Sequence, residues 1–129
     1  MTGYILDTHT YLWFISGDAK LSIKAKSIIE NADNEILLSA AVVWEIGIKA
    51  TIGKIHLRKD LDHLIAETFQ CYNFIPLAIT IPHVIRMNSL PEIHRDPFDR
   101  VLVAQSIAED MPLITADPTI KKYKIKTIW

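Results

Sequence analysis

The chain has 129 residues, of which 50% are hydrophobic and 22% are charged, and these values predict one globular domain, residues 1–129, rather than a disordered chain. Its single cysteine excludes an internal disulfide. No signal peptide or apolar run of the ~20 residues that cross a bilayer is visible, so we expect a cytoplasmic protein without membrane contact. The net charge of −1 argues against a protein that binds phosphate backbones by charge alone.

Strands and helices are predicted to alternate along the chain. In chain order they are a strand at 3–6, helices at 8–16 and 21–32, a strand at 35–39, helices at 39–53 and 61–72, an extended segment at 73–80 limited by Pro76, helices at 81–90 and 98–111, a strand at 112–117 and an edge strand at 124–129. Ser39 is the expected N-cap of the helix at 39–53, and Gly53 is its expected stop. The alternation of strands and helices favours an α/β three-layer sandwich. Its central, mostly parallel sheet would have about four or five strands, with helices on both faces.

Two of the predicted helices carry expectations about burial. Residues 11–15 of the first helix hold more large apolar side chains than one helical face can bury. At least one of Leu12, Trp13 and Phe14 should therefore be partly exposed or lie at an interface. Cys71, near the end of the fourth helix, is expected to be a small buried residue rather than a reactive thiol.

Acidic residues lie near the carboxyl ends of the predicted strands, where parallel sheets usually carry functional groups. Asp7 and Asp117 directly follow predicted strands, so their side chains should share the carboxyl edge of the sheet. Glu45 lies inside the helix after the second strand, and Asp99 joins the edge only if its helix runs close to it. As alternatives, Asp7 and Asp117 could cap helices. Glu45 could pair with Lys49, one helical turn further on.

The stretch HRDPFDR, residues 94–100, contains two aspartates with different predicted roles. Asp96 precedes Pro97 and is expected to be the N-cap, with proline at the first helical position. Asp99 falls at the capping-box position, which usually takes Glu or Gln because their longer side chains reach back to the cap. Asp99 is therefore the functional candidate and Asp96 the helix cap, although the reverse assignment stays open.

Carboxylates that converge need positive charge nearby. Without it they repel one another and raise each other's pKa values. Hard divalent cations such as Mg²⁺ and Mn²⁺ remove this repulsion and prefer oxygen ligands. A site of thiolates and imidazoles is not expected, because the chain has one cysteine and its five histidines show no ligand spacing.

Four segments in order resemble the motifs of the PIN domain, and more narrowly those of VapC-type toxins of type II toxin–antitoxin pairs. They are ILDTH, SAAVVWEIGIKATIGKIHL, HRDPFDRVLVAQSIAED and LITAD, and the resemblance covers nearly the whole chain. It implies a central parallel sheet with helices on both sides. It also implies a catalytic and metal-binding set made of Asp7, Glu45, Asp99 and Asp117. Ser39 and Thr115 would be polar neighbours of this set.

The activity implied by this resemblance is that of a metal-dependent endoribonuclease that uses Mg²⁺ or Mn²⁺. Its implied partners are an RNA substrate, an antitoxin protein and a second copy of the chain. The expected substrate-binding residues are Arg95, Arg100 and Thr115. For the two arginines the reason is that a guanidinium group suits phosphate geometry. The two arginines could equally pair with nearby acids at the surface. Basic residues of the tail, from Lys121 to Lys126, could add a patch for RNA or form a solvated end.

Three other functions are compatible with parts of the sequence. Haloacid-dehalogenase enzymes also begin with an aspartate after the first strand, but they need a second aspartate two positions later, where this chain has His9. A non-catalytic interaction domain with the same fold would be favoured by loss of one acid, and none is lost. A DNA-directed nuclease could use similar metal chemistry, although structure-specific nucleases of that kind are longer.

Overall fold

Five parallel strands form the central sheet in the computed structural model, which describes residues 3–129. They are β1 (Gly3–Leu6), β2 (Glu35–Ser39), β3 (Ile75–Leu77), β4 (Leu113–Ile114) and β5 (Thr127–Ile128). The strand order is β3-β2-β1-β4-β5, and every neighbouring pair is parallel. The chain moves outward from β1 to β3, then returns to the other side of β1. This reversal creates a switch point between β1 and β4, where open α/β sheets bind ligands.

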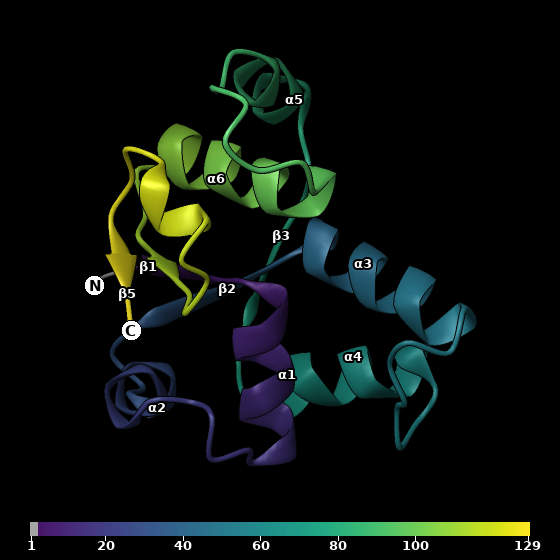
Figure 1. Cartoon of the computed structure of the whole chain (residues 1–129). Helices are drawn as coiled ribbons and strands as arrows, with labels where there is room; N and C mark the ends of the chain where they lie inside the picture. The colour runs from purple at the N-terminus through teal and green to yellow at the C-terminus, as the bar shows by residue number, and fades with distance from the viewer. Residues whose placement is uncertain (1–2) are drawn as a thin grey trace.

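Helices cover both faces of this sheet, as the sequence predicted. They are α1 (Thr8–Ser16), α2 (Ile23–Glu30), α3 (Ala40–Thr51), α4 (Leu61–Cys71), α5 (Ile81–Asn88) and α6 (Pro97–Glu109), followed by the short 3-10 helix η1 (Ile120–Lys122). In Figure 1, α5 and α6 lie on one side of the strands, and α1, α2 and α4 lie on the other. Helix α3 leaves the end of β2 and extends away from the sheet. None of the described helices is long and apolar enough to cross a membrane.

Because helices cover both faces of the sheet, the core contains the central strands. Strands buried on both faces carry continuous apolar runs, and Ile5, Leu6, Leu113 and Ile114 are completely buried. Helix α6 is buried over six consecutive residues, from Val101 to Ser106. Strand β4 is shorter than predicted because Thr115 and Asp117 form a turn instead, in which the backbone N–H of Asp117 donates to the Thr115 hydroxyl at 3.0 Å.

Local signals placed the helix starts correctly. Ser39 caps α3 by accepting from the backbone N–H of Ala41 at 3.0 Å, and Asp96 caps α6 by accepting from Phe98 at 2.9 Å. Both caps were predicted. Gly53, the predicted stop after α3, has a positive φ of 79°, a conformation that glycine adopts without strain.

The two expectations about burial had opposite outcomes. Leu12, Trp13 and Phe14 are all partly exposed, which confirms that one helical face cannot bury this run. The expectation for Cys71 was wrong, since its side chain is exposed. Cys71 is the last residue of α4, and Phe74, just beyond it, makes the core contacts at that end.

Ser39 has a second partner that makes it more important to stability than an ordinary cap. Its hydroxyl donates to the Oε1 atom of Gln105 at 2.6 Å, and both side chains are completely buried. Ser39→Ala would remove the cap and leave a buried amide oxygen without this donor. We therefore expect the free energy of unfolding to fall by about 2–3 kcal/mol in urea denaturation.

The matched control for this substitution is Ser22→Ala. Ser22 caps α2 through the backbone N–H of Ala25 at 3.0 Å and is only partly buried. Its loss should cost about 1 kcal/mol. Equal losses in the two variants would mean that the Gln105 contact contributes nothing.

Candidate carboxylate site

The four predicted acids come together at the carboxyl edge of the sheet, beside the switch point. Asp7 follows β1, Asp117 follows β4, Glu45 lies in α3 and Asp99 lies in the first turn of α6. Their proximity is visible in the pKa of Asp99, which rises to about 8. Burial is the main cause, and the charges of Asp96, Glu45, Asp7 and Asp117 add to it.

Asp7 is both a helix cap and a member of this set. It is 4% exposed, and its Oδ1 atom accepts from the backbone N–H of Thr10 at 2.9 Å. Its Oδ2 atom accepts a short hydrogen bond from the Thr115 hydroxyl. Burial raises the pKa of the Asp7 carboxyl. Thr115 therefore ties the end of β4 to the end of β1, and its own side chain is completely buried.

Glu45 is also buried, at 3% exposure, and both of its oxygens have partners. The Thr8 hydroxyl donates to Oε1 at 2.6 Å, and the ammonium group of Lys49 pairs with Oε2. The hydrogen bond to Glu45 raises the pKa of Lys49. The predicted pairing of Glu45 with Lys49 is thus present, and it does not take Glu45 away from the other acids.

The two aspartates of HRDPFDR occupy different positions. Asp96 makes the cap hydrogen bond of α6, whereas the Oδ2 atom of Asp99 lies 3.0 Å from Nε2 of His94. The same Nε2 atom lies 3.5 Å from Oδ2 of Asp117. The Oδ1 atom of Asp117 accepts from the backbone N–H of Thr119 at 2.8 Å. This bond lies in the turn before η1, whose N-cap position is Thr119, so Asp117 is not the helix cap considered as its alternative role.

His94 is the site residue that sequence reasoning missed. The ligand-type atoms of His94, Asp99 and Asp117 all lie within 4.8 Å of one another. The five histidines show no ligand spacing in the sequence, because this contact joins the loop before α6 to the turn after β4. The one available signal was that His94 belongs to HRDPFDR, the same stretch as Asp99.

The three predicted substrate-binding residues differ in their contacts and exposure. Arg100 donates to the backbone oxygens of Pro91 at 3.0 Å and Met87 at 3.1 Å, so it holds the loop between α5 and α6. These bonds favour a structural role for Arg100, though with carbonyl groups rather than the surface acids considered above. Thr115 faces Asp7 and is buried. Arg95 is exposed beside His94.

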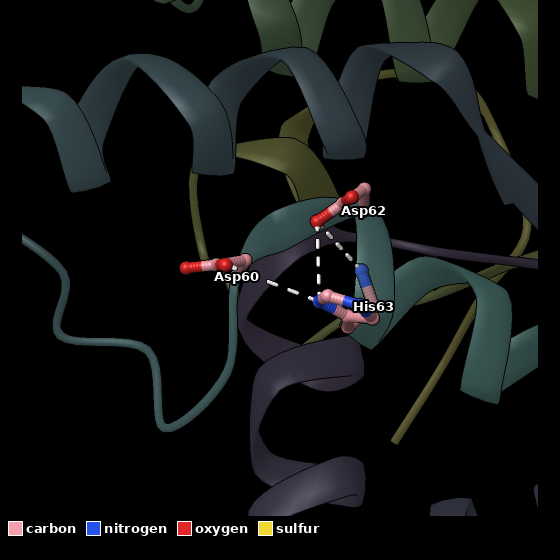
Figure 2. Close-up of side chains that lie close together, drawn as sticks. All are labelled: Asp60, Asp62 and His63. Carbon is pink, nitrogen blue, oxygen red and sulfur yellow. Dashed lines mark hydrogen bonds and ion pairs between the residues drawn. The ribbon is translucent and has the colours of Figure 1, made fainter.

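A second group of acids lies away from this edge, at the start of α4 (Figure 2). It consists of Asp60, Asp62 and His63, whose side chains are 72–88% exposed. The Nδ1 atom of His63 lies 3.5 Å from Asp62 and 3.9 Å from Asp60. Exposed ion pairs of this kind contribute little energy, and carboxylates are common in the first turn of a helix.

The acids at the sheet edge fit a divalent cation. Their ligand atoms are carboxylate oxygens, which Mg²⁺ and Mn²⁺ prefer. Burial and the neighbouring acids raise the pKa of Asp99 although Lys49 is paired with Glu45. A bound cation would place further positive charge beside these acids.

The chain is similar to known proteins over nearly its whole length. The family model of the PIN domain matches residues 4–126. Ribonuclease VapC22 of Mycobacterium tuberculosis is 29% identical to the chain, and the match covers all of both proteins.

Solved structures give the same fold. VapBC2 of Rickettsia felis, bound to a DNA fragment from its promoter, has a chain that superposes with a TM-score of 0.74, at 14% identity and with 99% of each chain covered. For DNA-bound VapBC of Salmonella typhimurium the TM-score is 0.67 at 13% identity, with 99% of this chain and 98% of the other covered.

Asp99→Asn should stabilise the metal-free protein at alkaline pH. Folding raises the pKa of Asp99 from about 4 in an unfolded chain to about 8. The folded chain therefore binds more protons than the unfolded chain between these values, and the stability of the wild type falls as pH rises through them. In urea denaturation with EDTA, the variant should be more stable by roughly 1–3 kcal/mol at about pH 9 and nearly equal at about pH 5.

The control is Asp33→Asn, which changes an exposed carboxylate in the turn before β2. It should leave the difference between the two pH values as in the wild type. An Asp99→Asn variant that gains no stability at alkaline pH would contradict the raised pKa.

Proposed function

The chain belongs to the PIN domain family, and we propose that it is a metal-dependent endoribonuclease that hydrolyses RNA phosphodiester bonds as the toxin of a toxin–antitoxin pair. The observation that carries this proposal is the meeting of four carboxylates at one sheet edge, where burial and, to a smaller degree, the neighbouring acids raise the pKa of Asp99 to about 8. The similarity to a protein named as a ribonuclease supports the choice of RNA as substrate.

We assign Asp7, Glu45 and Asp99 to a Mg²⁺ or Mn²⁺ ion, directly or through water, and Asp117 to a second ion or to the attacking water. When bound, such an ion supplies activation of water and stabilises negative charge on the reacting phosphate. In-line attack by water on phosphorus would need no nucleophilic side chain.

The neighbouring donors orient the acids. The hydroxyl of Thr8 donates to Glu45, and that of Thr115 donates to Asp7. Each carboxylate oxygen keeps a second lone pair that can face a cation. Hydrogen bonds of this kind fix the direction of ligand oxygens before the ion arrives. Thr115 thus serves the site through Asp7 rather than through direct contact with RNA.

Exposed basic residues near the site are the proposed phosphate contacts. Arg95 is exposed beside His94, and Lys121 and Lys122 are exposed in η1, shortly after Asp117. A chain of net charge −1 needs such local groups to hold RNA. Lys49 adds a further cation, whose pKa is raised by Glu45 and, to a smaller degree, by Asp96 and Asp99.

The proposed protein partners match two apolar surfaces. A cavity of about 430 Å³ between α1 and α4 is lined by apolar residues that include Leu12, Trp13, Ile15 and Leu64, and it could receive an apolar antitoxin helix. The exposed face of α5 carries Ile81, Val84 and Ile85, which a second copy of the chain could cover.

Asp7→Asn should abolish RNA cleavage without unfolding the protein. Asparagine caps a helix nearly as well as aspartate, so α1 should keep its start, whereas the charge that binds a cation is lost. The measurement is cleavage of a structured RNA pool in Mg²⁺ or Mn²⁺, with EDTA and a DNA substrate as further arms. Asp60→Asn, in the exposed group of Figure 2, is the matched control and should cleave like the wild type. Cleavage by Asp7→Asn at the wild-type rate would remove Asp7 from the site.

The division of roles inside HRDPFDR gives a second expected outcome. Asp96→Asn should keep most of the activity because the amide still caps α6. Asp99→Asn should lose the activity because one ligand charge disappears. Single-turnover cleavage rates, with thermal unfolding of each variant as the folding control, distinguish the two. The opposite ranking would exchange the two assignments.

Native mass spectrometry tests both protein partners. The chain of 14.7 kDa alone should give the mass of a dimer, and co-expression with a candidate antitoxin should add the mass of that partner. Ile15→Glu places a charge in the cavity between α1 and α4, so it should lose the antitoxin and keep the dimer. A monomeric wild type would refute the dimer, and an antitoxin retained by Ile15→Glu would exclude this cavity.

A further inference from the structure

We propose that His94 is a positioning residue of the carboxylate site. In this role its Nε2–H group, which lies close to both Asp99 and Asp117, attracts these two carboxylates and holds them together, while the imidazole itself stays outside the coordination sphere of the cation. This inference rests on the proposed metal-dependent function and adds to it a residue to which the predicted acidic set gives no role.

The backbone around His94 is held firmly in place. The backbone N–H of His94 donates to the hydroxyl of Tyr123 at 2.9 Å, and Tyr123 is 4% exposed. Arg100 fixes the preceding loop through the carbonyl groups of Pro91 and Met87. The ring is 20% exposed, so it belongs to the wall of the site rather than to a mobile surface.

The hydrogen bonds of the ring determine where its proton lies. The Nδ1 atom faces the backbone N–H of Asp96 at 3.1 Å. A backbone N–H can only donate, so Nδ1 accepts, and the proton of the neutral ring must lie on Nε2. A nitrogen that carries a proton has no lone pair to offer a metal. Nε2, which carries the proton, therefore lies 3.0 Å from the Oδ2 atom of Asp99 and 3.5 Å from the Oδ2 atom of Asp117, within ion-pair distance of both carboxylates.

The two acids held by this donor come from separate parts of the fold. Asp99 lies in the first turn of α6, and Asp117 lies in the turn after β4. Two carboxylates that approach each other repel, and a shared N–H between them reduces that repulsion. A donor in this place also fixes the direction of the oxygen atoms that remain free for a cation.

The competing role for His94 is that of a metal ligand. Its ring lies within 4.8 Å of the ligand atoms of Asp99 and Asp117, which is close enough for one ion to touch all three. This role would require the ring to give up the Asp96 N–H and to carry its proton on Nδ1. It would also make the site more favourable to Mn²⁺ than to Mg²⁺, because imidazole is a softer ligand than a carboxylate.

Two substitutions of His94 separate these roles. In His94→Gln the side-chain amide N–H₂ reaches about as far as Nε2, so the donor is kept. In His94→Asn the amide reaches only as far as Nδ1, so the donor is lost. Mn²⁺ affinity, measured by calorimetry on the full chain, should stay near the wild-type value for His94→Gln and fall about tenfold or more for His94→Asn.

A second measurement examines the ring directly. Electron spin-echo modulation of the Mn²⁺-loaded wild type should show no nitrogen bound to the ion, and nitrogen NMR of the metal-free chain should find the proton on Nε2. Direct coordination by the imidazole would overturn the proposal, as would equal Mn²⁺ affinities or equal losses in the two variants. Thermal unfolding of both variants shows whether a loss of Mn²⁺ affinity comes from misfolding. If His94→Asn does not fold, the Mn²⁺ affinity of His94→Gln is compared with that of the wild type.

The result for the wild type keeps this inference distinct from the proposed function. A wild type that binds no Mn²⁺ would refute the metal site and the role of His94 together. A wild type that binds Mn²⁺, with affinity unchanged in His94→Asn, would refute the role of His94 alone.

Discussion

Mutual repulsion between carboxylates at the edge of the sheet is the main constraint on the arrangement of this site. The carboxyl edge of the sheet gathers Asp7, Glu45, Asp99 and Asp117, and burial strengthens every charge interaction there. Polar and positively charged groups surround them: the hydroxyls of Thr8 and Thr115, which donate hydrogen bonds, the ammonium of Lys49 and the imidazole of His94. These groups partly offset the repulsion between the acids, while burial and the neighbouring charges still raise the pKa of Asp99.

The site is assembled by elements that are themselves ordinary. The parallel order of β1 and β4 brings Asp7 and Thr115 together, and the start of α6 delivers Asp99. Several of these residues serve the fold and the site at once: Asp7 caps α1, and Thr115 links two strand ends. A structural contact therefore does not exclude the proposed functional role, because each carboxylate has enough lone pairs for both.

Local rules predicted most of the fold from the sequence. The α/β sandwich, the caps Ser39 and Asp96 and the resemblance to the PIN domain were all confirmed, because apolar period and cap residues act over a few positions. The positions of His94 and Arg100 were not predictable in the same way. His94 meets Tyr123 and Asp117 across the fold, and such contacts leave no short-range pattern. Cys71 was misjudged because its residue type says little about where a helix ends.

The two outer strands of the sheet offer little backbone for pairing with another chain. Strand β3 contains Pro76, which has no N–H to donate, and β5 spans only Thr127 and Ile128. Neither edge offers a long unpaired ladder, so both resist the strand-to-strand growth that leads to aggregates. The proposed assembly through helix surfaces would then have little competition from the edges of the sheet.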